Sequence, residues 1–249
     1  MPALEAYKRE LDYSYAPGVF PSLEAMTKRP ELVRRLLISS KAEDSDGVQK
    51  LVSLAEERRI RVEIADKALS RISGKENCFA AAVFEKHPGT LSARGEPARD
   101  HHIVLHHVSD QGNLGTILRT ALGFGYHDIA IIRPAADVYD PKVVRASMGA
   151  LFSLRVREYD RFEDYRREFP QYTAYPFMLD GSIELATATA MAAGNHAPVA
   201  LIFGNEGAGL PPEFQQIGHP VRIPITDEVD SLNLAVAAAI GMYQIMIDE

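Results

Sequence analysis

Three closely spaced glycines near the carboxy terminus, Gly204, Gly207 and Gly209, directly follow the apolar run 198–203. An uninterrupted apolar run of this length is typical of a strand buried in a parallel sheet. Glycine lets the backbone turn sharply and approach a ligand, and open α/β sheets bind ligands at the carboxyl ends of their strands. The segment therefore predicts a ligand-binding turn, although a last β–α unit without a ligand fits the same pattern. Its glycine spacing differs from G-x-G-x-x-G, so a dinucleotide site is not indicated.

A second segment, residues 110–120, follows another apolar strand and has the pattern of a helix start. It carries two polar side chains suited to chemistry, Asn113 and Arg119. By spacing alone, a surface salt bridge from Arg119 to Asp110 or Glu206 explains the arginine as well as a catalytic role does.

A third segment opens the last helix of the chain with Ser231 and Asn233. Ser231 stands where an N-cap belongs, and an almost wholly apolar helix follows it. Free amide groups at a helix start favour a polar or anionic ligand. Helix capping alone explains both residues equally well.

Taken in order, these segments resemble the three motifs of the SpoU/TrmH family of SPOUT RNA methyltransferases, over roughly residues 103–247. The matching residues are Asn113, Gly115, Arg119, Thr120, Gly204, Asn205, Glu206, Gly209, Ile223, Pro224, Ser231, Leu232 and Asn233. The resemblance implies an α/β fold with a parallel-sheet SPOUT domain that ends in a deep trefoil knot. In the family the knot is the S-adenosylmethionine pocket, and two knots pack together as a homodimer.

The resemblance also implies methyl transfer from S-adenosylmethionine to a ribose 2′-hydroxyl. This displacement needs the methyl group and the oxygen in line, and it needs easier loss of the hydroxyl proton. The arginine that matches Arg119 is credited with activating the hydroxyl. Because a guanidinium is a poor base at neutral pH, we expect it to hold the adjacent phosphate and stabilise developing alkoxide charge. We expect Asn113 to cap its helix and contact the ribose, and Glu206 to orient Arg119 or backbone amides. The predicted catalytic set is Arg119, Asn113, Glu206, Ser231 and Asn233.

The cofactor requires apolar walls and backbone hydrogen bonds, with few charged contacts. The residues that the resemblance assigns to this task are Phe203, Gly204, Ile223, Ile225 and Leu232. Ordinary strand core is a compatible interpretation of the two isoleucines. The chain departs from the family pattern at Asp227, where glycine is frequent, and at Ala235, where a second serine is common.

From His101 onward, apolar runs of strand length alternate with segments of helical spacing. The expected strands are 103–108, 128–133, 151–156, 174–179, 198–203 and 221–225. The expected helices are 114–123, 141–147, 161–168, 183–192 and 232–247. This alternation predicts a parallel sheet covered by helices on both faces.

The first ninety residues predict a separate, small α/β domain. Helices are expected at 7–15, 22–28, 46–59 and 66–72, and strands at 36–38, 61–64 and 79–84. The pattern resembles the amino-terminal substrate-binding domain of many SpoU-type enzymes, a fold akin to certain ribosomal RNA-binding proteins, although a generic α/β cap also fits. Residues 86–100 have the glycine, proline and charge of a linker. We therefore place domains at 1–90 and 101–249, with a linker at 91–100.

The formal net charge of −7 is unusual for a nucleic-acid-binding protein. The first hundred residues hold 17 basic and 16 acidic side chains, whereas the remainder hold 10 and 18. If RNA binds, the first hundred residues must therefore supply much of the phosphate contact. The predicted RNA-binding residues are Arg34, Arg35, Arg58 and Arg59. A solvated helix face explains any single pair at least as well.

The single cysteine, Cys78, permits no internal disulfide and favours a reducing cytoplasm. No apolar window approaches a membrane span, and the charged amino terminus lacks a signal-peptide core. His101, His102, His106 and His107 do not predict a metal site, because strand neighbours point to opposite faces. His106 and His107 remain candidates for lining the substrate cleft.

We therefore expect a cytoplasmic, homodimeric RNA 2′-O-ribose methyltransferase that uses S-adenosylmethionine and binds neither membrane nor metal. The amino-terminal domain favours rRNA over tRNA. A tRNA 2′-O-methyltransferase and a non-catalytic RNA-binding ribosome-assembly factor on the same fold remain alternatives. An unrelated enzyme for a nucleotide cofactor is disfavoured, because dinucleotide and P-loop fingerprints are both absent.

Overall fold

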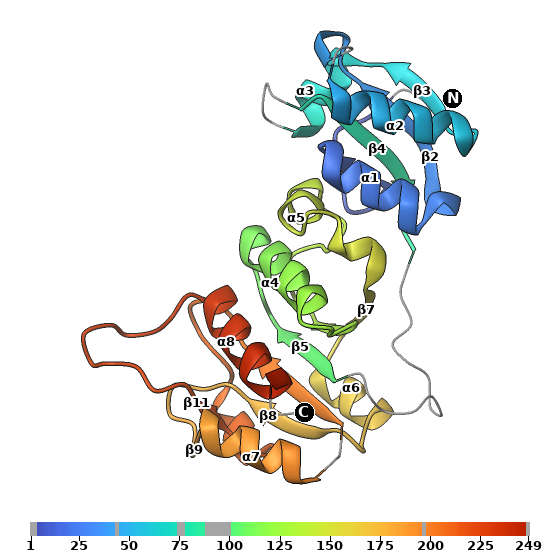
Figure 1. The fold of residues 1–249 in the computed structure, drawn as a ribbon. Helices are drawn as coiled ribbons and strands as arrows, with labels where there is room; N and C mark the ends of the chain where they lie inside the picture. The colour runs from blue at the N-terminus through green and yellow to red at the C-terminus, as the bar shows by residue number, and fades with distance from the viewer. Residues whose placement is uncertain (1–3, 43–44, 74–77, 88–100, 196–197, 248–249) are drawn as a thin grey trace. The chain divides into compact units, whose positions relative to one another are not determined.

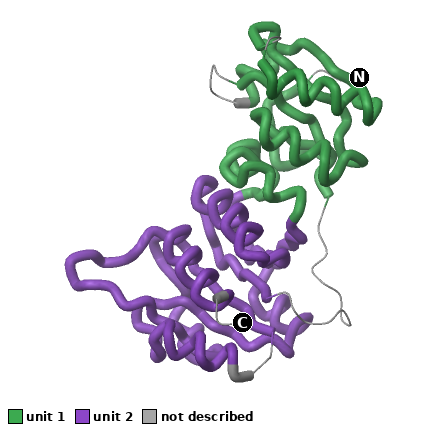
Figure 2. The backbone as a smooth tube through the Cα atoms, viewed as in Figure 1, with its two compact units in different colours: residues 1–87, 137–153 green, residues 88–136, 154–249 purple. Residues whose placement is uncertain are grey.

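The computed structural model describes residues 4–42, 45–73, 78–87, 101–195 and 198–247 (Figure 1). The chain divides into two compact units (Figure 2). Unit 1 consists of residues 1–87 and 137–153, and unit 2 consists of residues 88–136 and 154–249. The linker predicted at 91–100 lies outside the described residues.

Unit 1 contains a four-stranded sheet of order β1-β4-β2-β3, in which β4 is antiparallel to β1 and β2, and β3 is parallel to β2. Its strands are β1 (Tyr13–Pro17), β2 (Val33–Ile38), β3 (Arg61–Ile64) and β4 (Ala80–Glu85). Its helices are α1 (Val19–Lys28), α2 (Asp46–Glu57), α3 (Asp66–Ser73) and α5 (Pro141–Ala146). Short 3₁₀ helices are η1 (Pro30–Leu32), η2 (Ser40–Ala42) and η3 (Ala150–Ser153). An α/β fold for the amino-terminal region is thereby confirmed.

The helix predicted at residues 7–15 is wrong, because this segment leads into strand β1. Tyr15 is fully buried, and it lies opposite Val83 of β4 in the antiparallel ladder. Tyrosines at alternating positions suit a pleated, half-buried surface. Strand pairing therefore outweighs the weak helical pattern of the charged residues that precede it.

Residues 137–153 belong to unit 1, although the sequence places them between two strands of unit 2. The ring of Phe152 packs edge-on against Phe84 of β4, with centroids 4.9 Å apart. The strand predicted at 151–156 is wrong in its first half, because η3 occupies that part and the strand begins at Arg155. Leu151 and Phe152 are both buried in η3, so an apolar pair that resembles the start of a strand belongs to a 3₁₀ helix.

Unit 2 contains the predicted parallel sheet, of order β7-β6-β5-β10-β8. Its strands are β5 (His102–His106), β6 (Asp128–Ile132), β7 (Arg155–Tyr159), β8 (Thr173–Pro176) and β10 (Val199–Phe203). The neighbouring strands β5 and β10 are buried along their whole length, which accounts for the apolar run in each. Because the two strands are parallel, the segments that follow them meet at one edge of the sheet.

Helices cover the sheet of unit 2 (Figure 1). They are α4 (Gln111–Gly123), α6 (Phe162–Glu168), α7 (Leu185–Asn195) and α8 (Leu234–Ile247). Helix α8 packs on α4, α7 and β10. Gly241 permits this approach, since a Cβ there would lie 2.6 Å from Phe177 and 3.3 Å from Phe203. Within the described residues, no helix has the length and apolarity needed to cross a bilayer.

The strand predicted at 221–225 forms only in its first two residues. β11 (Val221–Arg222) pairs with β9 (Ile183–Glu184). Between β11 and α8 the chain forms only turns, bends and irregular structure. Pro224 has no backbone N–H to offer a ladder, which limits the strand. The 3₁₀ helix η4 (Pro212–Gln216) lies between the glycine turn and β11.

Candidate active site

The glycine turn at residues 204–209 is a closed backbone loop at the carboxyl end of β10. Asn205 and Gly209 exchange two backbone hydrogen bonds of 3.1 and 2.9 Å. The Asn205 side chain accepts two more, both of 3.0 Å, from the amides of Gly207 and Ala208. Gly209 has a φ of 67°, and a Cβ on Gly204 would lie 2.3 Å from the carbonyl carbon of Gly209. Two of the three glycines are therefore required by the turn itself.

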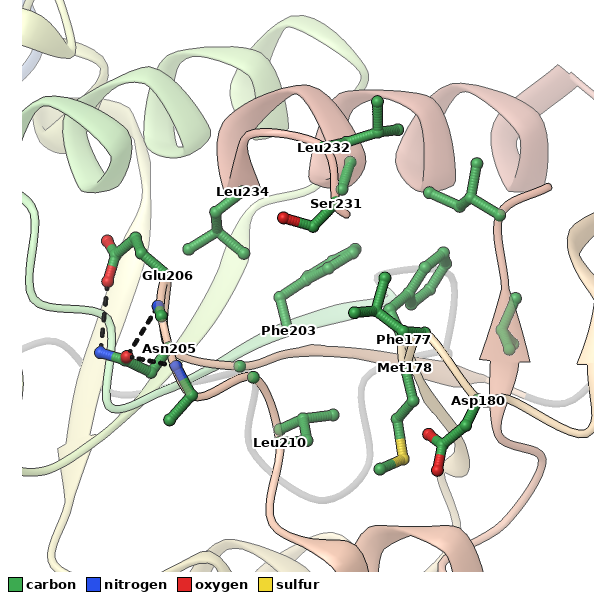
Figure 3. A pocket seen from close by; sticks show the side chains of 18 of the residues that line it. Phe177, Met178, Asp180, Phe203, Asn205, Glu206, Leu210, Ser231, Leu232 and Leu234 are labelled. Carbon is green, nitrogen blue, oxygen red and sulfur yellow. Dashed lines mark hydrogen bonds between the residues drawn. The ribbon is translucent and has the colours of Figure 1, made fainter. Parts of the chain in front are cut away.

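A cavity of about 270 Å³ lies beside this turn (Figure 3). Every residue predicted to bind the cofactor lines it: Phe203, Gly204, Ile223, Ile225 and Leu232. Glu206 and Ser231 line it as well. The ring of Phe203 stacks on that of Phe177, with centroids 4.5 Å apart. Apolar walls with a few polar groups and backbone amides suit an amphipathic small molecule.

Sequence reasoning missed several walls of the cavity, among them Phe177, Met178, Leu210, Leu234 and Ala237. Phe177 and Met178 directly follow β8, which pairs with β10. The strand order, which the sequence pattern does not contain, is what places both residues beside the glycine turn. Leu234 and Ala237 are three residues apart at the start of α8, which is a signal that helical spacing does provide.

The carboxylate of Glu206 holds the start of α4. It accepts hydrogen bonds from the backbone amides of Ser109 and Asp110, at 3.1 and 2.9 Å, and from the Ser109 hydroxyl at 3.0 Å. The side-chain amides of Asn113 and Asn205 each donate one more, of 3.3 Å. Burial raises the pKa of Glu206, but these donors outweigh it and hold the pKa below its ordinary value. Of the two roles expected for Glu206, the structure shows contact with backbone amides.

Asn113 and Asn233 join this cluster to the last helix. The side-chain oxygen of Asn113 accepts a hydrogen bond of 3.0 Å from the Asn233 side chain. The side-chain oxygen of Asn233 accepts from the backbone amides of Ala235 and Val236, at 2.9 and 3.3 Å. Side chains from all three predicted motifs are thereby connected through hydrogen bonds.

The capping roles predicted for Asn113 and Ser231 are wrong. Asp110 caps α4, because its carboxylate accepts a hydrogen bond of 2.7 Å from the backbone amide of Asn113. Asn113 lies inside the first turn, so its backbone is a donor there and its side chain is available elsewhere. Asn233 caps α8, and Ser231 lies before that cap, against the cavity.

Arg119 stands apart from the polar cluster. Its side chain is exposed, lies outside the cavity lining, and forms no ion pair within the described part of the chain. The surface salt bridge considered for it, to Asp110 or Glu206, is therefore not formed there. It follows Asn113 by six residues on α4, which places it about 9 Å further along the helix axis. An exposed, unpaired guanidinium is available to a phosphate.

In unit 1, carboxylates already hold Arg34 and Arg35. Arg34 pairs with Asp12 at 2.8 Å and with Glu85 at 3.0 Å. Arg35 pairs with Glu63 at 3.3 Å, and its side chain is only 12% exposed. Neither guanidinium is presented to solvent without a nearby negative charge.

Arg58 and Arg59 follow α2 and are more accessible. Arg58 lies 3.7 Å from Glu57, and both side chains are largely exposed. Arg59 is exposed, has a φ of 56°, and has no ion pair among the residues that the structure describes. Of the four predicted RNA-binding arginines, Arg59 is therefore the most available to a phosphate.

The histidines near β5 do not converge on one point. His102 is buried among aromatic rings, whereas His106 and His107 line a second cleft. Within the described ranges, no group of three His, Cys, Asp or Glu side chains is arranged to hold a metal ion.

Residues 100–243 match the model of the SpoU rRNA Methylase family. This match covers more than half of the chain, so the chain belongs to that family. The resemblance carried by the three motifs is thereby confirmed.

Two of the relatives are named as methyltransferases of 23S rRNA. The 23S rRNA (uridine(2479)-2'-O)-methyltransferase of Streptomyces viridochromogenes is 34% identical over 146 residues, which cover 57% of this chain and 50% of the relative. The 23S rRNA (guanosine(2553)-2'-O)-methyltransferase RlmP of Bacillus subtilis is 28% identical over 218 residues, which cover 81% and 82%. In its first curated matches the chain spans about half the length of the relative.

A solved structure shares the fold of nearly the whole chain. It is an AdoMet-bound rRNA methyltransferase from Sinorhizobium meliloti, with a TM-score of 0.77 and 27% sequence identity. The superposition covers 94% of this chain and 87% of the other. The predicted SPOUT fold class is thereby confirmed.

Proposed function

We propose that this protein transfers a methyl group from S-adenosylmethionine to a ribose 2′-hydroxyl of ribosomal RNA. The observation that carries the proposal is the convergence of Asn113, Glu206 and Asn233 beside an apolar cavity. These residues come from three distant segments, and a cap or a salt bridge alone would not require them to meet. The names of the relatives and the AdoMet-bound neighbour support the reaction and the methyl donor.

The cavity fits the methyl donor in its chemistry. Its apolar walls suit the adenine ring and the methionine chain, and the backbone groups of the turn supply hydrogen bonds. When bound, S-adenosylmethionine supplies a methyl group on a positively charged sulfur. We assign Phe203, Gly204, Ile223, Ile225 and Leu232 to holding it.

The chain's own residues position the acceptor and manage charge. Glu206 is already ionised at neutral pH and is held by five donors, so it organises the start of α4 rather than taking a proton. Because a guanidinium is a poor base, we assign Arg119 to binding the neighbouring phosphate and to stabilising negative charge that develops on the ribose oxygen. Ser231 and Asn233 present polar groups at the start of α8.

We further propose that two copies associate through α8 and that the carboxy-terminal segment is knotted, as the family resemblance implies. Val236, Ile240 and Tyr243 lie on one face of α8 and are 49%, 37% and 50% exposed. An exposed apolar stripe of this kind on a helix marks a contact surface. Sedimentation of the wild type and of Ile240→Lys tests this association. We expect the wild type to be a dimer and the variant to be a monomer. We also propose a cytoplasmic location.

Labelled S-adenosylmethionine, offered with separated rRNA and tRNA from a strain that lacks the gene, tests the proposal. We expect label in rRNA, on a ribose, with the wild type and very little with Arg119→Ala. Label in tRNA alone would show that the substrate is tRNA and not rRNA. Failure to bind S-adenosylmethionine would overturn the enzyme and favour a ribosome-assembly factor on the same fold.

A further inference from the structure

A second cleft, of about 680 Å³, shares the glycine turn with the first cavity. The residues that line both are Asn205, Ala208, Gly209 and Leu210. The second cleft also contains His106, His107 and Ser109, together with Pro134, Pro211 and Pro212. A ligand there would lie one backbone turn away from a methyl donor in the first cavity.

His106 in this cleft has an unsatisfied polar atom. The residue is 7% exposed, and its Nδ1 is buried without a hydrogen-bond partner in the described structure. A buried polar atom without a partner is unfavourable, and a hydrogen bond to a ligand in the cleft would remove that cost. Burial and, to a smaller extent, neighbouring His107 lower the pKa of His106 to about 4, against the opposing effect of Glu213 and Glu163. The ring is therefore neutral at pH 7, with one donor and one acceptor nitrogen.

His107 provides a held aromatic surface beside it. Its ring stacks on that of His106, with centroids 3.8 Å apart. Its backbone has a φ of 58°, and its carbonyl accepts a hydrogen bond of 2.9 Å from the Asn205 side chain. The described lining contains prolines but neither lysine nor arginine. Stacking surfaces without positive charge suit an uncharged planar ring rather than a phosphate.

Ser109 connects the two cavities. It lines the second cleft, and its amide and hydroxyl donate to Glu206, which lines the first. A ring bound in the second cleft would therefore place an attached sugar beside the cluster of Glu206 and Asn113.

We propose that the second cleft binds the base of the nucleotide whose ribose is methylated, turned out of the RNA. The Nδ1 atom of His106 makes a hydrogen bond to the edge of the base, and the His107 ring stacks on its face. This inference rests on the proposed function and deepens it, because it names the residues that select the acceptor base.

The test is a titration of protein saturated with S-adenosylhomocysteine, which occupies the first cavity, with each of the four nucleosides. Histidine ring signals are followed by NMR. His106→Phe keeps the ring that packs on Phe214, 5.1 Å away, but removes the nitrogen. His107→Asn removes the stacking ring and tolerates the left-handed backbone. His219→Asn, outside both cavities, is the matched control.

We expect saturable shifts of the His106 and His107 signals, with one nucleoside preferred, and no shift with inorganic phosphate. His106→Phe should weaken binding about tenfold, and His219→Asn should leave it unchanged. Absence of shifts in protein that binds S-adenosylhomocysteine would overturn the inference alone. Equal nucleoside binding by the wild type and His106→Phe would also overturn it. Absence of S-adenosylhomocysteine binding, measured first by calorimetry, would instead overturn the proposed function.

Discussion

The polar cluster of unit 2 and the arginines of unit 1 differ in where their partners come from. Asn113 meets Glu206 and Asn233 across sequence separations of 93 and 120 residues. Arg34 and Arg35 are instead balanced by carboxylates on their own sheet or directly before it. Ordered motifs are informative because several residues must meet at one place. Counts of basic residues are less informative, because the nearest carboxylate determines what each charge can do.

The largest effect should come from Gly204→Ala, which attacks the turn that holds the site together. A Cβ there would lie 2.3 Å from the backbone of Gly209, so the turn must shift. We expect loss of S-adenosylmethionine binding and a stability loss of up to about 3 kcal/mol, measured by calorimetry and urea unfolding. Gly123→Ala is the control, because the space around that Cβ is open. Equal effects of the two changes on binding and stability would contradict the claim that the turn requires glycine at position 204.

Arg119→Ala should reduce methyl transfer without reducing stability. The side chain is exposed and without an ion pair in the described chain, so its removal should alter unfolding by less than about 0.5 kcal/mol. Loss of charge stabilisation in the transition state should lower kcat by about 100- to 1000-fold. Near-normal turnover with normal RNA binding would remove Arg119 from the chemistry.

Glu206→Gln should lower the free energy of unfolding by a smaller amount than Gly204→Ala does. The carboxylate accepts from five donors, and its replacement should cost about 1 kcal/mol at pH 7 after allowance for solvent screening. Because the folded pKa lies below the ordinary 4.5, this stabilisation is present above pH 4.5 and disappears as the pH falls through the folded pKa. Urea unfolding of both proteins from pH 7 to pH 3 should therefore show convergence in acid. Parallel curves would contradict this account of Glu206.

The smallest expected effect is a difference in rRNA binding between substitutions of Arg59 and of Arg34. Arg59→Gln should weaken rRNA binding about threefold and reduce the salt dependence by about one phosphate contact, because that guanidinium is unpaired in the described structure. Arg34→Gln should leave the salt dependence unchanged, since Asp12 and Glu85 already hold the side chain. Filter binding at several salt concentrations measures both. A larger change in salt dependence for Arg34→Gln than for Arg59→Gln would contradict the conclusion that Arg59 is the more available of the two.

Much of unit 2 could be predicted from sequence because three of its strands, β5, β6 and β10, are buried along their whole length. Their apolar runs located these three strands, and the sequence order of the motifs located Asn113, Glu206 and Asn233 in one site. The errors lie where tertiary pairing decides the outcome. Residues 7–15 lead into a strand because β4 is beside them, and 151–156 begin as a 3₁₀ helix because Phe152 packs on Phe84.

Details of the site depended on information that spacing does not contain. The caps proved to be Asp110 and Asn233, because side-chain direction at a helix start depends on backbone angles. The walls Phe177 and Met178 required the pairing of β8 with β10. The unpaired Nδ1 of His106 is visible only when every neighbour is placed.

Calorimetric titration of S-adenosylmethionine into the wild type and Ala237→Phe tests the central claim most directly. Ala237 lines the first cavity from α8, and a phenyl ring there would occupy the space assigned to the methyl donor. The account predicts one bound molecule per wild-type chain and binding at least about 100-fold weaker in the variant, with the unfolding temperature retained. Absence of binding to the wild type, or equal binding to both proteins, would contradict it.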